Sequence, residues 1–360
     1  MTAGPGSEVE QPPARRVVRG GLDSLVGAIV LVVGALVLAV LPLVVSTSWT
    51  SRLITLCIYI VLAVMWNLLA GFGGMVSIGQ QAYIGLGAYG LIVLADQFDL
   101  DPFLSIPVAG IVAGVIAVPV SFLAFRLVGG YFAIGTWVIA EVARLVTVQF
   151  DQVGRGSGVS LRALAGTDPT ARIELTYWWA LGLAVLAVTG SVLLVRSPLG
   201  VALTAIRDEP TAAASNGVDV ARVKRIVFVV SAIGCGAAGA MLALSSLRVQ
   251  PDSVYSVQWT AFMIFMVVIG GIGTLEGPII GAVVFFALQQ ALGDYGSTYL
   301  VVLGVVAIVV VLAAPRGLWG VVGRGGQVQL FPIRYRVREA RSAPQPTAPA
   351  APPATSEEAL

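Results

Sequence analysis

The 360-residue chain is 57% hydrophobic and only 11% charged, with a formal net charge of +2 and a mean hydropathy of +0.92, whereas a soluble domain carries about 25% charged residues. This composition excludes an ordinary water-soluble protein and predicts an all-α, polytopic integral membrane protein. The sequence contains no histidine, which excludes the usual catalytic triad, and the two cysteines, Cys57 and Cys235, lie in apolar segments without metal-binding spacing.

The uncharged stretches predict about ten spanning helices (a range of about 8–11), because a helix needs about 20 apolar residues to cross a bilayer. The first stretch, 24–51, is too long for the apolar core of a cleavable signal peptide. The stretch 53–95 is too long for one span and long enough for two spans with a break between them. The other expected spans are 102–125, 131–148, 175–195, 226–247, 253–275, 277–293 and 295–315.

The distribution of basic residues predicts an orientation. An even number of crossings places both termini on one side, and a cytoplasmic N-terminus puts most of the 21 basic residues in cytoplasmic segments, as the positive-inside rule requires. We therefore expect a multi-pass membrane protein with both termini cytoplasmic. The polar tails, 1–22 and 321–360, are expected to be disordered, and the transmembrane domain is expected to cover 23–320.

Two glycine-rich stretches echo each other in the two halves of the chain. "GGMVSI" at 73–78 and "GGIGTL" at 270–275 share a pattern of two glycines, an apolar residue and a later hydroxyl residue. Paired interruptions of this kind are typical of transporters built from two repeats, and a broken helix is tolerated only inside protein or beside a water-filled cavity. We therefore expect two helix breaks related by an internal repeat, with a substrate pathway at Ser77, Gln80, Gln81, Thr274, Gly73, Gly74, Gly270, Gly271 and Gly273.

Three ionisable residues lie in or near the expected spans. Glu141 and Arg144 are three residues apart on one predicted helix and can share a face, either as a pair that offsets its own desolvation or as functional groups. Glu276 lies in the second break, where it can cap the next helix or stand at a cytoplasmic mouth, with Pro278 in the first turn.

One substantial cytoplasmic loop, 196–225, contains a well-delimited short helix. Asp208 or Glu209 stands at the predicted N-cap, Pro210 at the first helical position, and Gly217 at the C-terminal stop. Loops longer than about 12–15 residues are usually functional. This short helix is therefore expected to lie on lipid or to dock in a groove of a partner.

Several motifs make the chain similar to a known family. "AIRDEPTAAASNG" (205–217) resembles the coupling segment of ABC importer permeases. "LAVMWNLLAGFGGMVSIGQQAYIGLGAYG", "RLVGGYFAIGTWVIAEVARLV", "RVKRIVFVVSAIGCGAAGAMLA" and "VIGGIGTLEGPIIGA" with "APRGLWG" resemble, in order, motifs of the branched-chain amino acid permease family, in its LivM-type subunit.

The resemblance implies a permease subunit of an ABC importer, not an enzyme, that translocates branched-chain or related small amino acids across a bacterial plasma membrane by alternating access. It implies a second, LivH-like permease, two cytoplasmic ATPases and an extracytoplasmic binding protein as partners, with ATP held by the ATPases and no cofactor, metal or nucleic acid bound by this chain. Consistent with ATP binding by the partner subunits, the sequence contains no G-x-x-x-x-G-K-[ST] motif, the Walker A loop that binds ATP phosphates. A urea or short-chain amide permease and an ATP-independent secondary transporter are the alternatives. The residues implied in ATPase coupling are Arg207, Glu209, Ala212, Ala213 and Gly217.

Overall fold

The computed structural model describes residues 15–18, 22–293, 298–314, 317–322 and 336–339. Its first half contains α1 (Leu22–Val40), η1 (Leu41–Leu43), α2 (Thr47–Asn67), η2 (Leu68–Phe72), α3 (Gln81–Gln97), α4 (Ser105–Ala124), α5 (Gly130–Val148) and η3 (Asp151–Val153). Its second half contains α6 (Pro169–Arg196), α7 (Pro198–Asp208), α8 (Pro210–Ser215), α9 (Val220–Ser246), α10 (Pro251–Val254), α11 (Gln258–Gly270), α12 (Gly277–Leu292), α13 (Thr298–Ala313) and α14 (Gly317–Val322). Four short strands are β1 (Arg15–Val18), β2 (Val159–Ser160), β3 (Arg248–Val249) and β4 (Arg336–Glu339).

The all-α, polytopic architecture that the composition predicts is confirmed. In the described part of the chain, seven helical segments are long and apolar enough to cross a membrane. They are Thr47–Phe72, Ser105–Ala124, Gly130–Val148, Pro169–Arg196, Val220–Ser246, Pro251–Gly270 and Leu300–Val321. The expected total of about ten crossings stays a prediction, which requires that shorter helices such as α12 also span.

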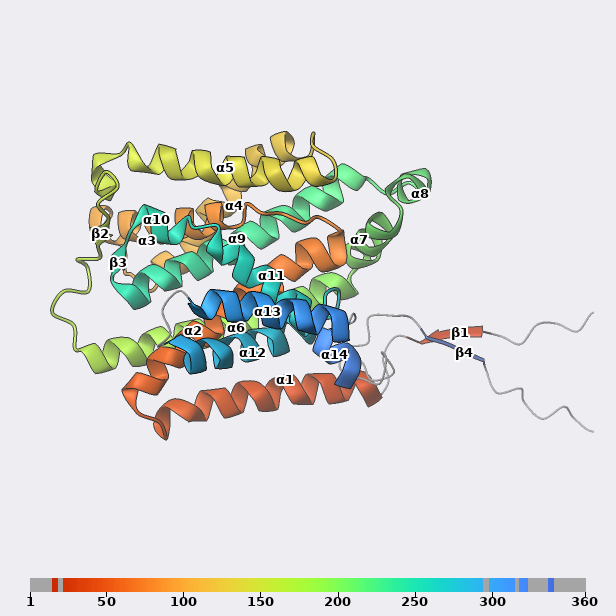
Figure 1. Cartoon of the computed structure of the whole chain (residues 1–360), viewed down its shortest axis with the longest axis horizontal. Coiled ribbons are helices and arrows are strands. Elements are labelled where there is room, and N and C mark those ends of the chain that lie inside the picture. The colour runs from red at the N-terminus through yellow and green to blue at the C-terminus, as the bar shows by residue number, and fades with distance from the viewer. Residues whose placement is uncertain (1–14, 19–21, 294–297, 315–316, 323–335, 340–360) are drawn as a thin grey trace, which may run out of the picture.

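Helix α2 forms the centre of the molecule. Of the most apolar window in Thr47–Phe72, 94% is buried, and α2 packs against α6, α9, α11 and α12 (Figure 1). The residues of α2 after Arg52 are uncharged, so this helix can be enclosed by other helices without leaving a charge unpaired.

Helices α3 and α9 approach one another at backbone distance. A Cβ placed on Gly87 would lie 1.8 Å from the carbonyl oxygen of Gly236, and a Cβ on Gly239 would lie 2.0 Å from that of Ile84. Small residues allow such contacts where lipid supplies no hydrophobic force between helices. This close crossing fixes the position of α3, which follows the first glycine-rich stretch.

The two ends of the helical body differ. Helices α7 and α8 and the strands β1 and β4 lie toward one end, and β2 and β3 lie at the other (Figure 1). The strands β1 and β4 form an antiparallel ribbon in which Arg15 is opposite Glu339. The sequence predicts disorder in both tails; these two segments are strands in the structure, and most other tail residues lie outside the described ranges.

Candidate functional site

The first helix break follows η2, which is a single π-helical turn at the end of α2. The backbone leaves the helix after Gly73 and becomes helical again at Gln81. Gly74 adopts a φ of +65°, which glycine reaches without the steric strain that a Cβ would cause. The chain is therefore interrupted at the first stretch that the sequence singled out; its relation to the second stretch by an internal repeat stays a prediction.

The second helix break lies between α11 and α12, where Gly271 and Gly273 have φ values of +129° and +77°. The hydroxyl of Thr274 donates to the carbonyl of Gly271 at 2.8 Å and accepts from the N–H of Gly277 at 3.0 Å. It thereby satisfies one of the free N–H groups at the start of α12. Glu276 occupies the N-cap position, but its side chain makes no capping hydrogen bond, so the expected cap is provided by Thr274.

The two breaks meet at Asn67, the last residue of α2. Its side-chain amide donates to the carbonyl of Thr274 at 2.8 Å, and its side-chain oxygen accepts from the N–H of Gly273 at 2.9 Å. Asn67 is 2% exposed, and a Cβ on Gly71 would lie 2.6 Å from the nitrogen of Gly273. The sequence analysis missed Asn67; the signal that could have found it is a single amide side chain in an apolar run directly before the glycines.

Arg207, in the last turn of α7, links the loop formed by α7 and α8 to both breaks. Its Nη1 donates to the carbonyl of Gly71 at 3.0 Å, while its Nε and Nη2 donate to one carboxylate oxygen of Asp208 at 3.0 and 2.9 Å. A Cβ on Gly74 would lie 3.1 Å from Cγ of Arg207, and one on Gly273 would lie 3.5 Å from Nη1. The guanidinium therefore lies where the two breaks touch, held in place by the neighbouring carboxylate.

Two further glycines of the predicted pathway are packed tightly. A Cβ on Gly270 would lie 1.8 Å from the carbonyl oxygen of Gly277, and a Cβ on Gly73 would lie 3.2 Å from Cδ1 of Leu203 in α7. These glycines allow backbone contact within the second break and side-chain contact between the first break and α7.

Helix α8 has the ends that the sequence predicts. The carboxylate of Glu209 accepts from the backbone N–H and the hydroxyl of Thr211, and these bonds lower the pKa of Glu209 below its ordinary value. Gly217 follows the helix with a φ of +83°. Ala213 is buried against the body, whereas Ala212 and Glu209 are exposed, so one face of this loop is free to meet another protein.

The polar side chains after the first break are paired inside the protein. Gln80 donates to the hydroxyl of Ser77 at 3.4 Å and accepts from that of Ser231 at 3.5 Å. The side-chain oxygen of Gln81 accepts from the hydroxyl of Thr260. Ser77, Gln80 and Gln81 are at most 1% exposed. The structure thus groups these residues with α9 and α11, and no side-chain hydrogen bond joins them to Thr274.

Helix α5 packs over the first break and carries the predicted ion pair. The hydroxyl of Thr136 accepts from the N–H of Ile78 at 3.1 Å. Further along α5, Nε of Arg144 donates to Oε1 of Glu141 at 2.9 Å, and Nη1 donates to Oδ1 of Asp252 at 2.7 Å. The Glu141–Arg144 pair is therefore formed, with Asp252 as a third member from α10 that the sequence did not indicate.

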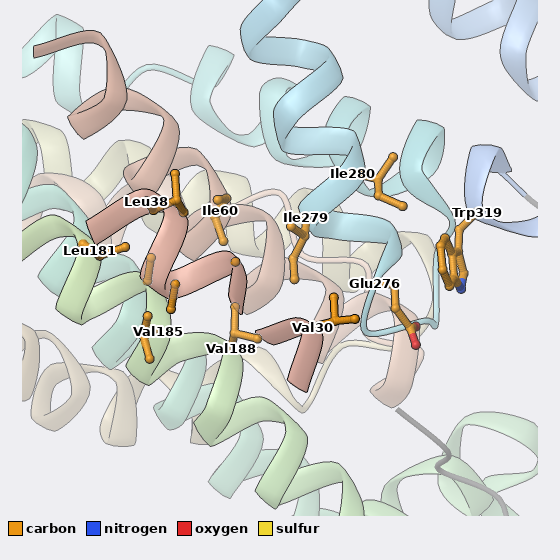
Figure 2. A pocket seen from close by; sticks show the side chains of 13 residues that line it. Val30, Leu38, Ile60, Leu181, Val185, Val188, Glu276, Ile279, Ile280 and Trp319 are labelled. Carbon is orange, nitrogen blue, oxygen red and sulfur yellow. The ribbon is translucent and has the colours of Figure 1, made fainter. Parts of the chain in front are cut away.

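An apolar cavity of about 280 Å³ lies among α1, α2, α6, α12 and α14. Its walls are aliphatic, and Glu276 and Trp319 lie toward one end (Figure 2). None of the predicted pathway residues lines it. A cavity with these walls suits hydrocarbon and offers few partners to a polar solute. Among the described residues, no group of three or more acidic, cysteine or histidine side chains could hold a metal ion.

Comparison with known proteins gives concordant results. A family model described as "Branched-chain amino acid transport system / permease component" matches residues 48–312. The chain is 28% identical over 303 residues to the "High-affinity branched-chain amino acid transport system permease protein LivM" of Escherichia coli (strain K12), covering 77% of this chain and 71% of the relative. It is 23% identical over 266 residues to a "Probable branched-chain amino acid transport permease protein LivH" of Methanocaldococcus jannaschii, covering 68% of this chain and 83% of the relative. No solved structure matches significantly.

Proposed function

The chain belongs to the branched-chain amino acid transport permease family and is a permease subunit of an ABC importer, and from this premise we propose that it moves branched-chain or related small amino acids by alternating access driven by partner ATPases. Urea or a short-chain amide is the alternative substrate class. The protein is a multi-pass membrane protein of a system with a second permease. The proposal also includes a bacterial plasma membrane as the location and a cytoplasmic position for both termini. It further includes two ATPases and a binding protein that complete the system.

The contact of Arg207 with the first break carries this proposal. Helices α7 and α8 form a substantial loop outside the spanning body, and Arg207 joins this loop to the carbonyl of Gly71. Because Gly71 touches Gly273, a displacement of α7 and α8 is transmitted to both breaks at once. The exposed residues Glu209 and Ala212 would then meet the ATPase, while Arg207 and the buried Ala213 would transmit its motion.

The proposed pathway opens where the breaks separate. Ser77, Gln80 and Gln81 are neutral donors and acceptors that suit a zwitterion or a small amide better than a bare ion. They are enclosed in this conformation, so a substrate reaches them only when α3, α9 and α11 move apart. The glycines of both breaks supply the backbone freedom for this motion.

The proposal is tested by transport in proteoliposomes that contain the complete importer. We expect Arg207→Ala to lower ATP-driven uptake about tenfold while ATP hydrolysis continues, since loss of one charged hydrogen bond is worth about 1.5–3 kcal/mol. Arg222→Ala, which removes an exposed arginine from the first turn of the neighbouring helix α9, is the matched control and should leave uptake unchanged. Glu209→Ala and Gly217→Trp should also reduce uptake. Wild-type uptake by the Arg207, Glu209 and Gly217 variants would refute the coupling role.

A further inference from the structure

Helix α5 presents most of its surface away from the rest of the chain. Only 17% of its most apolar window is buried, and its buried residues, Phe132, Thr136, Ala140 and Thr147, form one stripe that faces the body. The opposite stripe, which we call the α5 outer face, consists of Ile134, Trp137, Val138, Glu141 and Leu145. These residues recur at the three- and four-residue spacing of one helix face.

A carboxylate lies in the middle of this apolar face. The side chain of Glu141 is 47% exposed, and it lies about 10 Å from the C-terminal end of α5 at a rise of about 1.5 Å per residue. Charged side chains within a span almost always face protein or a water-filled cavity, because exposure to hydrocarbon is costly. The outer face of α5 is therefore unsuited to lipid.

Other exposed faces in the described part of the chain differ in this respect. The outward residues of α4, such as Ile111 and Val115, and those of α13, such as Ile308, are apolar, and neither helix contains a charged residue. Hydrocarbon can cover these residues without enclosing a charge. The contrast separates α5 from helices that are exposed simply because they border the bilayer.

The charge of the cluster identifies the kind of partner. Arg144 is shared by Glu141 and Asp252, so two carboxylates and one guanidinium leave a net charge of −1. A second copy of this chain would bring the same negative cluster, and like charges across an interface oppose association. A partner with a basic or donating group at this depth is the better complement, and the depth of Glu141 within the span excludes a purely extracytoplasmic protein.

We propose that the α5 outer face, with the Glu141–Arg144–Asp252 cluster, binds the second permease of the importer, a homologous but different chain that offers a basic or hydrogen-bond-donating group to Glu141. This inference rests on the proposed function, which supplies a second permease. It also explains why α5, whose inner stripe contacts α3, α4 and α10, leaves its outer face uncovered in this chain.

The test measures what surrounds α5 in the assembled transporter. Cys57 and Cys235 are buried, so a spin label can be attached to Val138→Cys on α5 and, as a matched control, to Val115→Cys on α4. Oxygen, which partitions into lipid, and a water-soluble nickel chelate report lipid and water around each label. In nanodiscs we expect oxygen access at position 138 to fall roughly tenfold when the second permease is present, as in a desolvated interface core, without a gain in nickel access. Position 115 should stay accessible to oxygen in both states.

Four outcomes contradict parts of this scheme and can be distinguished. If oxygen access at position 138 does not change on assembly, α5 faces lipid. This result overturns the proposed interface but not the proposed function. High nickel access there shows an aqueous surface, which also overturns it. Low oxygen access at position 138 in the absence of the second permease identifies a second copy of this chain as the occupant of the α5 outer face and overturns the proposed partner. Failure of the second permease and the ATPases to co-purify with the chain overturns the proposed function itself.

A charge variant gives an independent measurement. Glu141→Gln should lower the amount of second permease that co-purifies by about tenfold, the equivalent of about 1.4 kcal/mol, without changing the thermal stability of this chain alone. Asp151→Asn, which breaks the exposed pair between Asp151 and Arg155, is the matched control and should have no effect. Equal recovery from both variants would refute the role of Glu141.

Discussion

At the scale of single residues, Asn67 shows how one amide side chain can hold two distant breaks together. It donates to the carbonyl of Thr274 and accepts from the N–H of Gly273, and both groups belong to a stretch that no helix satisfies. A buried backbone group without a partner costs about 1–3 kcal/mol. Asn67 therefore stabilises the observed arrangement of the breaks through groups more than two hundred residues away.

Substitution of Asn67 should reveal this role. Asn67→Leu keeps most of the volume but leaves the two backbone groups unpaired, so we expect the free energy of unfolding to fall by about 1–3 kcal/mol for each group. The measurement is thermal unfolding of the chain in nanodiscs, together with uptake by the complete importer. Asn67→Asp keeps the acceptor for the N–H of Gly273, so its thermal stability should lie between that of the Leu variant and that of the wild type. A Leu variant as stable as wild type would show that the two hydrogen bonds are unimportant.

At the scale of secondary-structure elements, two glycines that look alike in the sequence have opposite roles. Gly87 of α3 faces the carbonyl of Gly236 at a distance that admits no Cβ, whereas Gly182 of α6 has no atom within 4 Å of the position of a Cβ. Glycine inside a helix is about 1 kcal/mol less favourable than alanine. Replacing glycine by alanine therefore raises stability only where the neighbouring helix leaves room for the added Cβ.

Alanine at these two positions should therefore shift stability in opposite directions. Gly87→Ala forces α3 and α9 apart and should lower the free energy of unfolding by about 1–3 kcal/mol or more. Gly182→Ala should raise it by about 0.4–1 kcal/mol. The measurement is the apparent unfolding temperature of each variant in nanodiscs. Equal shifts in the two variants would contradict the close α3–α9 contact.

The cap of α8 should make ATPase coupling dependent on acid pH. The bonds from Thr211 lower the pKa of Glu209 in the folded loop below its ordinary value of 4.5. The stabilisation from this cap is therefore fully present above the ordinary pKa and is lost as the pH falls through the lowered value. We expect acid pH to lower uptake per ATP hydrolysed in the wild type, and we expect Glu209→Gln to lower the same ratio at neutral pH. A Gln variant that couples normally while acid still uncouples wild type would assign the acid effect to another group.

At the scale of the whole molecule, the features of the chain suit a subunit of a multisubunit transporter. The loop that includes Arg207 stands outside the spanning body, the sequence contains no Walker A loop of its own, and the α5 outer face carries an intramembrane charge. Under the proposed function, a protein organised in this way would depend on other subunits for energy and for closure of its path. An ATP-independent secondary transporter would need none of them.

This dependence is measurable in liposomes. With this chain alone, we expect no uptake of branched-chain amino acids above that of empty vesicles, because nothing drives α7 and α8. Addition of the second permease, the ATPases and the binding protein should make uptake depend on ATP. Saturable uptake by the chain alone would favour the secondary transporter over the importer mechanism.

The sequence by itself determined the features that depend on local composition. Apolar length predicted the helices, and glycine clusters marked both interruptions. Asp208 or Glu209, together with Pro210 and Gly217, delimited α8, because caps and breaks depend on a few adjacent residues. The Glu141–Arg144 pair was likewise readable from its spacing within one helix turn.

The tertiary structure alone decided which distant groups meet. Asn67 joins the second break across 206 positions, Arg207 reaches Gly71 across 136, and Asp252 joins Arg144 across 108. The enclosure of Ser77, Gln80 and Gln81 by α9 and α11 was also beyond the sequence. The physical reason is that helix packing in lipid depends on the fit of surfaces, which no local pattern encodes.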